Sequence, residues 1–397
     1  MEHGENPDRL RILITLQYYV PHRTGYTLYI QWVAEELARR GHAVTVLTAR
    51  YRMDLPRDEQ VINGVRVIRL WAPIRVSRGM IMPAYPWAVA ALIAQHDVVW
   101  VSTPTAETAL IAFLAELLGK PVVATHHGDL VLPRGLLNAV ITWVTYRFYA
   151  YMARRAAALV AYSEDYADHS YYLMPFRDKV SVIYPPIRIP EPQPERVAEL
   201  RAQWSLEGGP VIGYSGRFVE EKRPDLLIRS LEIINREYPN ARIVFAGEYD
   251  IPYENTWERH QALVRQYGDQ LIFLGVLTNE QDMANFYAAC DVLVLPSDTE
   301  CFALVQVEAM LCGTPVVMTD IPGGRVPVRE TGMGLIVPPG DHQAIGCAVL
   351  EILKDPAAFQ RPRSEIARLF SFQETVDRYE QLFRLHAAGR GREAHGG

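Results

Sequence analysis

Residues 293–319 read LVLPSDTECFALVQVEAMLCGTPVVMT, and this stretch contains a strand, a helix and a second strand. The first apolar run ends at Pro296, so it predicts a buried strand that continues into a loop. A helix is predicted over residues 302–312, because Gly313 can adopt the left-handed conformation that ends helices and Pro315 cannot continue one. The apolar run at 316–318 then completes the pattern of a strand, a crossover helix and a parallel strand.

Two glutamates, Glu300 and Glu308, lie eight residues apart around the start of this helix. At about 100° per residue, Glu308 falls about 40° from Leu304 on the buried side, and Gln306 is predicted to face away. The residues three and four positions from Glu308 carry no charge that could neutralise it. Its carboxylate therefore bonds either to a loop amide or an arginine elsewhere in the fold, or to a ligand, and we favour a ligand site.

Length and composition restrict the class of protein. A chain of 397 residues is too long for one ordinary core and predicts two domains. The formal net charge of -6 argues against a general nucleic-acid binder. The four cysteines form no C-x-x-C pair, which favours reduced thiols in a cytoplasmic protein over a metal site. No apolar segment typical of a secretion signal is present near the start, and no transmembrane helix is predicted.

Strand-like and helical patterns alternate in two series along the chain. Helical patterns such as 28–40 and 136–157 separate the strand-like runs of the first series. This alternation predicts doubly wound parallel sheets, a Rossmann-like α/β architecture. The strand-like runs are 12–16, 44–48, 65–70, 98–102, 122–125, 159–162 and 180–184, and then 211–214, 243–246, 271–274, 292–295, 316–318 and 335–337.

The proline-rich stretch 185–194 interrupts the alternation and indicates a linker. Ser371 and Glu374 have the spacing of a capping box, which predicts a last helix, and the glycine-rich, charged tail after it is predicted to be disordered. The predicted divisions are an N-terminal domain at 1–187, a linker at 188–209, a C-terminal domain at 210–370, a last helix at 371–386 and a disordered tail at 387–397.

Polar residues gather at the predicted carboxyl ends of the strands, where open parallel sheets bind their ligands. Two such edges that face each other would form a cleft between domains, and pockets form preferentially at such places. The polar residues concerned are 17–25, 126–129, Ser163, Arg217, Gly247 and 297–300.

Four further motifs accompany the two glutamates: GRFVEEKRPDLL at 216–227, FLGVL at 273–277, TPVVMTDIPG at 314–323 and GLIVPPGD at 334–341. With these motifs and its E-x7-E pair, the chain resembles the retaining nucleotide-sugar glycosyltransferases of glycosyltransferase family 4 over residues 11–386. The resemblance implies the GT-B fold, in which an acceptor-side Rossmann-like domain and a nucleotide-sugar-binding one face each other across a cleft. It also implies that the last helix crosses back to pack on the first domain.

The resemblance implies a role for each site residue. Arg217 and Lys222 match the family's R-x4-K spacing and are implied to contact the donor diphosphate, although an isolated pair of this kind would indicate a solvated basic loop. Glu308 is implied to accept hydrogen bonds from ribose hydroxyls, and Glu300 from hydroxyls of the donor sugar. His127 is implied to meet the donor sugar, with a capping or hinge role as the alternative and the adjacent histidine as a competitor.

Two positions depart from the family's pattern. The sequence TGY at 24–26 replaces a Gly-Gly pair, which affects the acceptor-side geometry, and Ala303 adds one methyl group near the phosphates where glycine is common. The predicted catalytic residues are His127, Arg217, Lys222 and Glu300. The predicted donor-binding residues are Gly25, Gly216, Arg217, Lys222, Gly247, Leu274, Gly275, Val276, Glu300, Phe302, Ala303, Leu304 and Glu308.

A departing nucleoside diphosphate needs its negative charge stabilised. The sequence has no D-x-D run that could chelate a metal ion, but it offers three other devices. Arg217 ends a strand, Lys222 precedes a helix opened by Pro224, and residues 302–304 supply helix amide groups. We therefore predict no metal site and no cofactor beyond the donor substrate.

The predicted activity is transfer of a hexose from a nucleoside diphosphate sugar to a hydroxyl group, with an α-linkage in the product. The resemblance implies retention by departure and attack on one face, and no protein nucleophile is assigned. A GT-B epimerase or phosphorylase and a non-catalytic nucleotide-sugar-binding subunit stay open as alternatives. The motifs of nicotinamide dehydrogenases, P-loop kinases and G-x-S-x-G hydrolases are missing.

Residues 130–163 contain arginines and aromatic residues but no acidic residue. Arg134, Arg147, Arg154 and Arg155 supply the charge, and a basic, aromatic helix can lie in the interface of an anionic membrane. The alternative is a core helix whose arginine ends reach water. The membrane interpretation predicts a peripheral protein on the cytoplasmic face of the membrane, with a lipid-linked acceptor or a growing cell-envelope glycan.

Overall fold

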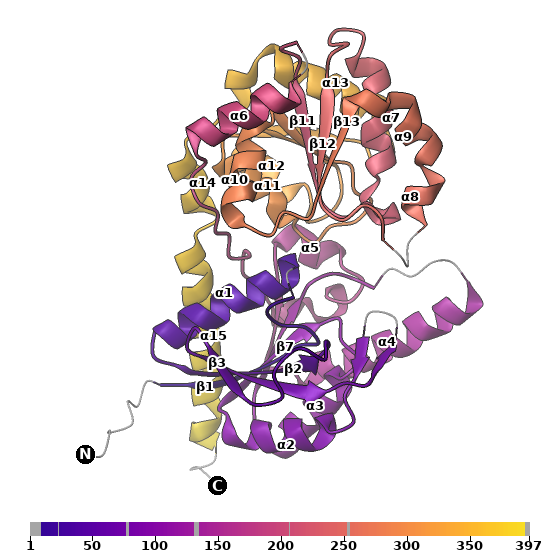
Figure 1. The fold of residues 1–397 in the computed structure, drawn as a ribbon. Coiled ribbons are helices and arrows are strands. Elements are labelled where there is room, and N and C mark those ends of the chain that lie inside the picture. Colours follow the sequence, from indigo (N-terminus) through magenta and orange to yellow (C-terminus); the bar gives the residue numbers. More distant parts are fainter. Residues whose placement is uncertain are drawn as a thin grey trace. The chain divides into compact units, whose positions relative to one another are not determined.

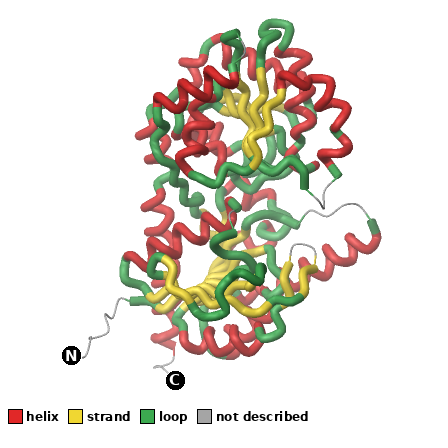
Figure 2. Tube along the Cα trace, viewed as in Figure 1, coloured by secondary structure: helices red, strands yellow, loops and turns green. Residues whose placement is uncertain are grey.

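The computed structural model describes residues 9–22, 24–76, 79–130, 135–205, 207–251 and 255–393. The chain divides into two compact units, each built around a parallel sheet with helices on its faces (Figures 1 and 2). The first unit combines Met1–Pro186 with Gln373–Gly397, and the second is Ile187–Phe372. The predicted α/β architecture with two Rossmann-like sheets is confirmed.

The first unit contains an eight-stranded sheet in the order β10-β9-β8-β7-β1-β2-β4-β3. All neighbours are parallel except β3, which pairs antiparallel with β4 at one edge. The predicted strands are confirmed, whereas β3, β5 and β6 were missed because three-residue edge or hairpin strands leave no long apolar run. The strands are β1 (Arg11–Thr15), β2 (Ala43–Arg50), β3 (Gln60–Ile62), β4 (Val65–Trp71), β5 (Ile74–Val76), β6 (Gly79–Ile81), β7 (Val98–Thr103), β8 (Val122–His126), β9 (Ala158–Ala161) and β10 (Val180–Val182).

The helices of the first unit cover both faces of this sheet. The first of them begins at Gly25, earlier than predicted, because the hydroxyl of Thr24 caps it and forms a capping box with Thr27. The helices are α1 (Gly25–Arg39), α2 (Tyr85–Gln95), α3 (Thr108–Leu117), α4 (Leu136–Arg155), α5 (Glu164–His169), the short 3-10 helix Met174–Lys179 and α15 (Phe372–Glu393).

The second unit contains a six-stranded, wholly parallel sheet in the order β13-β12-β11-β14-β15-β16. Its strands are β11 (Val211–Ser215), β12 (Arg242–Ala246), β13 (Leu271–Gly275), β14 (Val292–Leu295), β15 (Val316–Thr319) and β16 (Gly334–Val337). Its helices are α6 (Pro194–Trp204), α7 (Pro224–Ile234), α8 (Thr256–Arg259), α9 (Gln261–Tyr267), α10 (Glu280–Ala289), α11 (Leu304–Leu311), α12 (Val326–Thr331), α13 (His342–Lys354) and α14 (Arg363–Leu369). The core lies where α7 and α13 pack on one face of the sheet.

The segment 188–209 does not act as the predicted linker, because it contains α6 and belongs to the second unit. The ring of Trp204 packs on Phe286 with 6.1 Å between ring centroids. The backbone amide of Gln193 donates to Asn285 at 2.8 Å. Pro194 occupies the first turn of α6, where a missing amide hydrogen costs nothing, so the proline marked a helix start rather than a linker.

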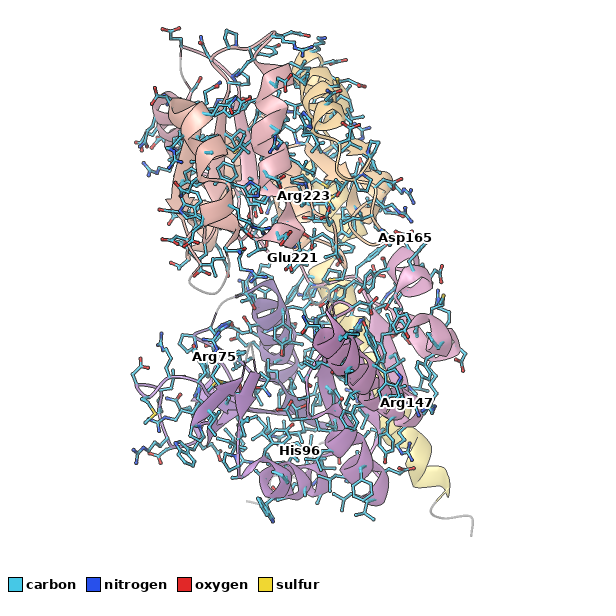
Figure 3. All side chains as sticks on the ribbon, turned by 90° about the vertical axis from the view of Figure 1, so that its right-hand side faces the viewer. Arg75, His96, Arg147, Asp165, Glu221 and Arg223 are labelled. Carbon is cyan, nitrogen blue, oxygen red and sulfur yellow. The ribbon has the colours of Figure 1, made fainter. Side chains whose placement is uncertain are left out.

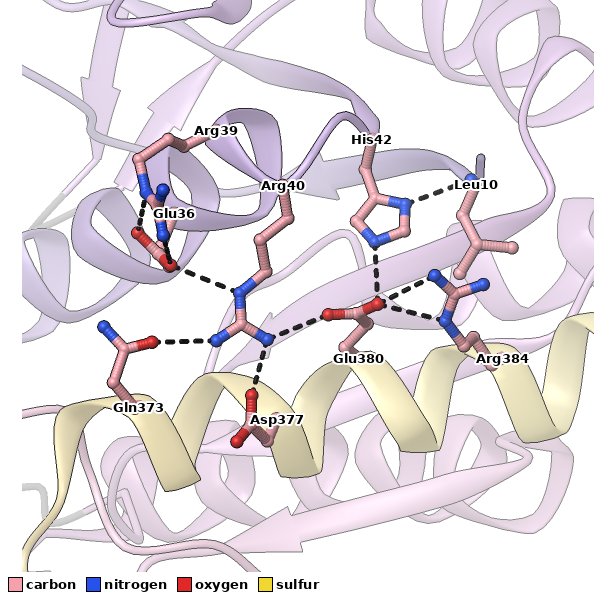
Figure 4. A network of polar contacts seen from close by, with 9 residues as sticks. All are labelled: Leu10, Glu36, Arg39, Arg40, His42, Gln373, Asp377, Glu380 and Arg384. Carbon is pink, nitrogen blue, oxygen red and sulfur yellow. Dashed lines mark hydrogen bonds and ion pairs between the residues drawn. The ribbon is translucent and has the colours of Figure 1, made fainter. Parts of the chain in front are cut away.

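Helix α15 packs within the first unit through a polar network (Figure 4). Nη1 of Arg40 contacts Asp377 at 2.6 Å and Glu380 at 2.9 Å. Nε2 of His42 lies 3.2 Å from Glu380, and Arg384 donates to the same carboxylate at 2.8 Å. Burial opposes ionisation of Glu380, but these donors outweigh it and lower the pKa of Glu380 to about 2.

Helix α15 also extends beyond its predicted end. It continues to Glu393, so most of the tail predicted to be disordered is helical, because Ala387 and Ala388 continue the helix favourably. Residues 394–397 lie outside the described residues.

Candidate functional site

The sheet of the second unit changes winding direction between β11 and β14. In open α/β sheets, ligands bind beyond the carboxyl ends of the strands at such a point. Gly216 and Arg217 follow β11, and residues 296–300 follow β14. The fold therefore brings together two segments that are about eighty residues apart in sequence.

Lys222 and Glu300 form an ion pair at this edge. Lys222 ends a 3-10 turn, Glu220–Lys222, and its Nζ donates to Oε1 of Glu300. The hydroxyl of Ser297 donates to the same oxygen at 3.1 Å. The hydroxyl of Thr319 donates to the backbone carbonyl of Ser297 at 2.5 Å. The Glu300 carboxylate is thus paired with Lys222, which lies 78 residues away in the sequence. The sequence pattern around Glu300 alone could not reveal this partner.

Arg217 is the second cation of this edge. Its Nη2 lies 3.3 Å from Oε1 of Glu221, four residues further along, and about a third of each side chain is exposed. The hydroxyl of Tyr214 donates to the backbone carbonyl of Arg217 at 2.8 Å and fixes the main chain there. Exposed ion pairs of this length contribute little to stability, so Arg217 can exchange Glu221 for another anion.

Glycines draw the ends of β11, β12 and β13 together. The backbone amide of Gly247 donates to the carbonyl of Gly275 at 2.8 Å, and that of Gly216 donates to Ala246 at 2.9 Å. A Cβ atom on Gly247 would lie 2.0 Å from the carbonyl oxygen of Gly216, so no larger residue fits. Leu274 is the last residue of β13 before Gly275, and the Val276 side chain after the strand is 62% exposed.

The first turn of α11 offers backbone donors to the same edge. Ala303 precedes the helix in the left-handed conformation, with φ 57° and ψ 78°, and no side chain caps the helix there. Uncapped amide groups at a helix start bind anions. The helix begins at Leu304 rather than at the predicted Phe302, whose ring is fully buried against Phe370 at 5.6 Å.

Glu308 is bonded to a residue that the sequence did not suggest. The hydroxyl of Tyr287 on α10 donates to Oε2 of Glu308 at 2.7 Å and lies 3.2 Å from the hydroxyl of Ser215. Burial raises the pKa of Glu308 to about 6, against the hydrogen bond from Tyr287, which lowers it. The carboxyl is therefore close to changing its charge near neutral pH.

The prediction that Gln306 faces away from the core is wrong. The side chain is fully buried. Its Nε2 donates to the carbonyls of Gly324 at 2.7 Å and Phe302 at 3.2 Å. Hydrogen bonds to two backbone carbonyls offset the desolvation of the Nε2 group, whereas Oε1 has no hydrogen-bond partner among the described residues.

In the first unit, His127 follows β8 inside a group of tyrosines. Its Nδ1 is hydrogen-bonded to the hydroxyl of Tyr162, and the rings of Tyr26 and Tyr29 lie 4.7 and 5.6 Å from its own. Burial, aided by the neighbouring histidine, lowers the pKa of His127 to about 3, so the ring is neutral at physiological pH. Its Nε2 has no hydrogen-bond partner among the described residues.

The adjacent histidine is engaged on both sides of its ring. Nδ1 of His126 lies 3.0 Å from the hydroxyl of Thr103, and Nε2 lies 3.1 Å from Asp129. Only His127 therefore keeps a ring nitrogen for a further contact. Gly25, the remaining predicted residue of this unit, is the first residue of α1. Within the described ranges, no cluster of three or more His, Cys, Asp or Glu residues is arranged to hold a metal ion.

Two protein-family models match the chain in the same order as the two units. The model described as "Glycosyl transferase 4-like domain" matches residues 24–186, and the one described as "Glycosyl transferases group 1" matches residues 197–369. The chain belongs to glycosyltransferase family 4. The resemblance drawn from the motifs is confirmed.

Two named relatives resemble this family 4 glycosyltransferase over most of their length. The D-inositol 3-phosphate glycosyltransferase of Saccharomonospora viridis is 27% identical over 92% of this chain and 90% of its own length. The GDP-mannose-dependent alpha-(1-6)-phosphatidylinositol monomannoside mannosyltransferase of Mycolicibacterium smegmatis is 26% identical over 87% of this chain and 90% of its own. Both the family models and relatives that match most of the chain therefore identify it as a glycosyltransferase.

A solved structure supports the fold of this glycosyltransferase. The Anabaena protein HepE, solved with UDP and glucose, superposes with a TM-score of 0.75 at 19% identity, covering 94% of this chain and 99% of its own. The predicted GT-B fold is confirmed. No helix in the described part of the chain is long and apolar enough to cross a membrane.

Proposed function

We propose that this glycosyltransferase moves a hexose from a nucleoside diphosphate sugar to a hydroxyl group and retains the α configuration. One observation carries the proposal. Arg217, Lys222 and the uncapped start of α11 converge at the switch point of the second sheet, beside two carboxylates. Cations and free amides suit a diphosphate, and carboxylates suit the hydroxyls of a ribose and a sugar.

Each group has a distinct task in this proposal. Arg217 and Lys222 neutralise the charge that develops on the departing diphosphate, which is the largest electrostatic demand of the reaction. Glu308 accepts hydrogen bonds from the ribose, and Glu300 accepts them from the donor sugar. The neutral ring of His127 donates to the donor sugar through Nε2.

Departure and attack occur on the same face of the sugar. The bond from C1 to the diphosphate oxygen breaks with its electron pair left on the diphosphate. The acceptor oxygen forms the new bond to C1 and loses its proton to the departing diphosphate. No protein nucleophile is needed, and we propose that the two cations replace a metal ion and that no cofactor takes part.

The acceptor is proposed to be lipid-linked or a growing cell-envelope glycan, and helix α4 supports this. Leu136, Val140 and Trp143 follow one another at helical spacing on one face of α4, and they are 90%, 59% and 65% exposed. The guanidinium of Arg147 stacks over the Trp143 ring at 5.6 Å from its centroid (Figure 3). The exposure of this face argues against a core helix whose only contact with water is through its arginine ends. Arg134, one of the predicted basic residues, lies outside the described residues.

We propose that this face of α4 lies in the interface of an anionic membrane, so that the protein is peripheral on the cytoplasmic side. The apolar side chains of this face enter the interface, and each arginine near it contributes up to about 1 kcal/mol. The relative from Mycolicibacterium smegmatis is named for a phosphatidylinositol monomannoside, which is a lipid-linked acceptor.

Co-sedimentation with liposomes of rising anionic lipid content tests the membrane proposal. The double variant Val140→Ser/Trp143→Ser should lose most of its binding, and high salt should weaken binding of the wild type. Leu385→Ser, which removes an equally exposed apolar side chain from α15, is the matched control. Binding that ignores lipid charge and salt, or no binding at all, would favour a soluble acceptor.

The transfer itself is tested in two steps. A thermal-shift screen with UDP, GDP and ADP sugars identifies the donor, because a ligand at 100 times its Kd stabilises the fold by about 2.7 kcal/mol. The product made from the selected donor is then examined by NMR. An α-linked product is expected, and a β-linked product would refute retention.

A further inference from the structure

The turn that carries Lys222 is joined to the loop that carries Glu300 at three points. The first is the ion pair between these two side chains. The second is a hydrogen bond from the backbone amide of Asp298 to the carbonyl oxygen of Glu221, at 2.9 Å. The third is the guanidinium of Arg223, whose Nη1 lies 3.5 Å from both carboxylate oxygens of Asp298 (Figure 3).

Arg223 adopts an unusual backbone conformation. Its φ of 48° and ψ of 46° place it in the left-handed region, which is unfavourable for a residue with a Cβ atom. The residue ends the turn that contains Lys222 and directly precedes Pro224, which opens α7 and disfavours helical geometry before it. Glycine would adopt this conformation without strain, so the backbone does not explain an arginine here.

The contacts of the side chain do explain it. Nε and Nη2 of Arg223 donate to the two carboxylate oxygens of Asp225 at 3.0 and 3.1 Å. The Asp225 side chain is only 11% exposed, and it belongs to the first turn of α7. This forked contact fixes the plane of the guanidinium, and the third nitrogen is thereby held toward Asp298.

We propose that Arg223 is a positioning residue that holds the Lys222 turn against the Glu300 loop. It acts through Asp225 and Asp298 and does not itself touch the donor. The inference rests on the proposed role of Lys222 and Glu300 in donor binding. Two groups that must contact a substrate together contribute much less to catalysis when either is displaced by about 1 Å. The contacts of Arg223 with Asp225 and Asp298, which we call the Arg223 clamp, therefore preorganise the site.

The variant Arg223→Gly tests this most directly, because it removes the guanidinium and relieves the backbone at the same time. We expect kcat/KM to fall by about 10- to 100-fold while the protein still folds, because relief of the left-handed backbone offsets part of the lost pairing with Asp225. Arg223→Lys keeps the charge without the fork and should restore only part of the activity. Arg229→Ala, at an exposed position of α7, is the matched control and should have no effect.

A double-mutant cycle separates positioning from a general structural role. In a Lys222→Ala background, Arg223→Gly should lower kcat/KM by less than about twofold, because little is left for Arg223 to position. If the effect of Arg223→Gly is as large in that background as in the wild type, or if Arg223→Gly alone is fully active, the proposal is overturned.

Amide hydrogen exchange of the free protein gives a readout independent of catalysis. Arg223→Gly should speed exchange at Asp298 and its neighbours in residues 297–301, whereas Arg229→Ala should not. Unchanged exchange contradicts the clamp even if the protein is an active glycosyltransferase. A wild-type protein that neither binds nucleoside diphosphates nor transfers sugar would refute the proposed function instead, and the exchange result would still decide whether Arg223 joins the two segments.

Discussion

At the scale of single residues, Glu308 makes nucleotide affinity depend on pH. Burial raises the pKa of Glu308 to about 6, so the free fold favours the protonated carboxyl and loses stability as the pH rises through this value. The carboxylate of Glu308 must be ionised to accept hydrogen bonds from two ribose hydroxyls. The affinity for a nucleoside diphosphate should therefore fall as the pH is lowered from 7.5 to 5, measured by isothermal titration.

The variant Glu308→Gln is the control for that measurement. It should bind the nucleotide more weakly at pH 7.5, and it should keep only the pH dependence that belongs to the phosphate groups of the ligand. Equal affinity of the wild type and Glu308→Gln at pH 7.5 would refute the ribose role.

A second prediction at this scale concerns the phosphate contacts. Arg217→Ala and Lys222→Ala should each lower kcat/KM by a factor of about 10² or more, equivalent to about 2.7 kcal/mol, with the fold intact. Circular dichroism and melting curves verify the fold, and steady-state kinetics give the ratio. A fully active Arg217→Ala variant would contradict the assignment.

The sequence located these residues but not their partners. The positions of Glu300 and Glu308 in a strand-helix-strand pattern placed both at a ligand edge. Their partners, Lys222 and Tyr287, lie 78 and 21 residues away, and no local window relates them. Gln306 was misplaced because helical periodicity assigns polar residues to water, whereas hydrogen bonds to backbone carbonyls allow burial.

At the scale of elements, the attachment of α15 to the first unit depends on Glu380. Its pKa of about 2 lies below the ordinary value of a glutamate, so the ionised carboxylate stabilises the fold at neutral pH and this contribution is lost as the pH falls from about 4.5 to 2. Glu380→Gln should lower the free energy of unfolding by roughly 1–3 kcal/mol at pH 7.

Urea unfolding at pH 7 and at pH 3 measures this difference. The gap between the wild type and Glu380→Gln should narrow as the carboxylate becomes protonated. Glu374→Gln, which removes an exposed carboxylate paired with Arg378 on the same helix, is the control and should change stability by less than about 1 kcal/mol. A constant gap across the pH range would show that the loss comes from packing.

Central strands were predictable because they are short apolar runs buried on both faces. The three-residue strands β3, β5 and β6 were not, because β3 pairs on one side only and β5 and β6 form a separate hairpin. Their side chains need not be apolar, so hydrophobic patterns carry little information about them. Helix ends were predicted less accurately, because they depend on capping side chains. The hydroxyl of Thr24 caps α1, so the helix starts several residues before the predicted start.

At the scale of the whole molecule, the alternation of strands and helices revealed two sheets but not where each unit begins and ends. The second unit starts at Ile187, and the last residues of the chain belong to the first unit. The proline-rich stretch was read as a linker because prolines interrupt strands, although one of them begins a helix.

Removal of residues 373–397 should therefore damage the first unit and spare the second. The side chains of Tyr379 and Phe383 are fully buried and lie 4.7 and 5.5 Å from the ring of Trp100. The truncated chain should expose this aromatic surface and bind a hydrophobic dye, yet still bind a nucleoside diphosphate in calorimetry. Loss of nucleotide binding together with intact packing of the first unit would contradict this division.

Because α15 completes the first unit, synthesis and folding run in different orders in this protein. The first half of the chain leaves the ribosome long before the segment that supplies Tyr379 and Phe383, with the entire second unit between them. Domains usually fold as they emerge, from the N-terminus onward. Here the ring of Trp100 lacks its partners from α15 until the end of the chain has been made, so the second unit is the first that can finish folding.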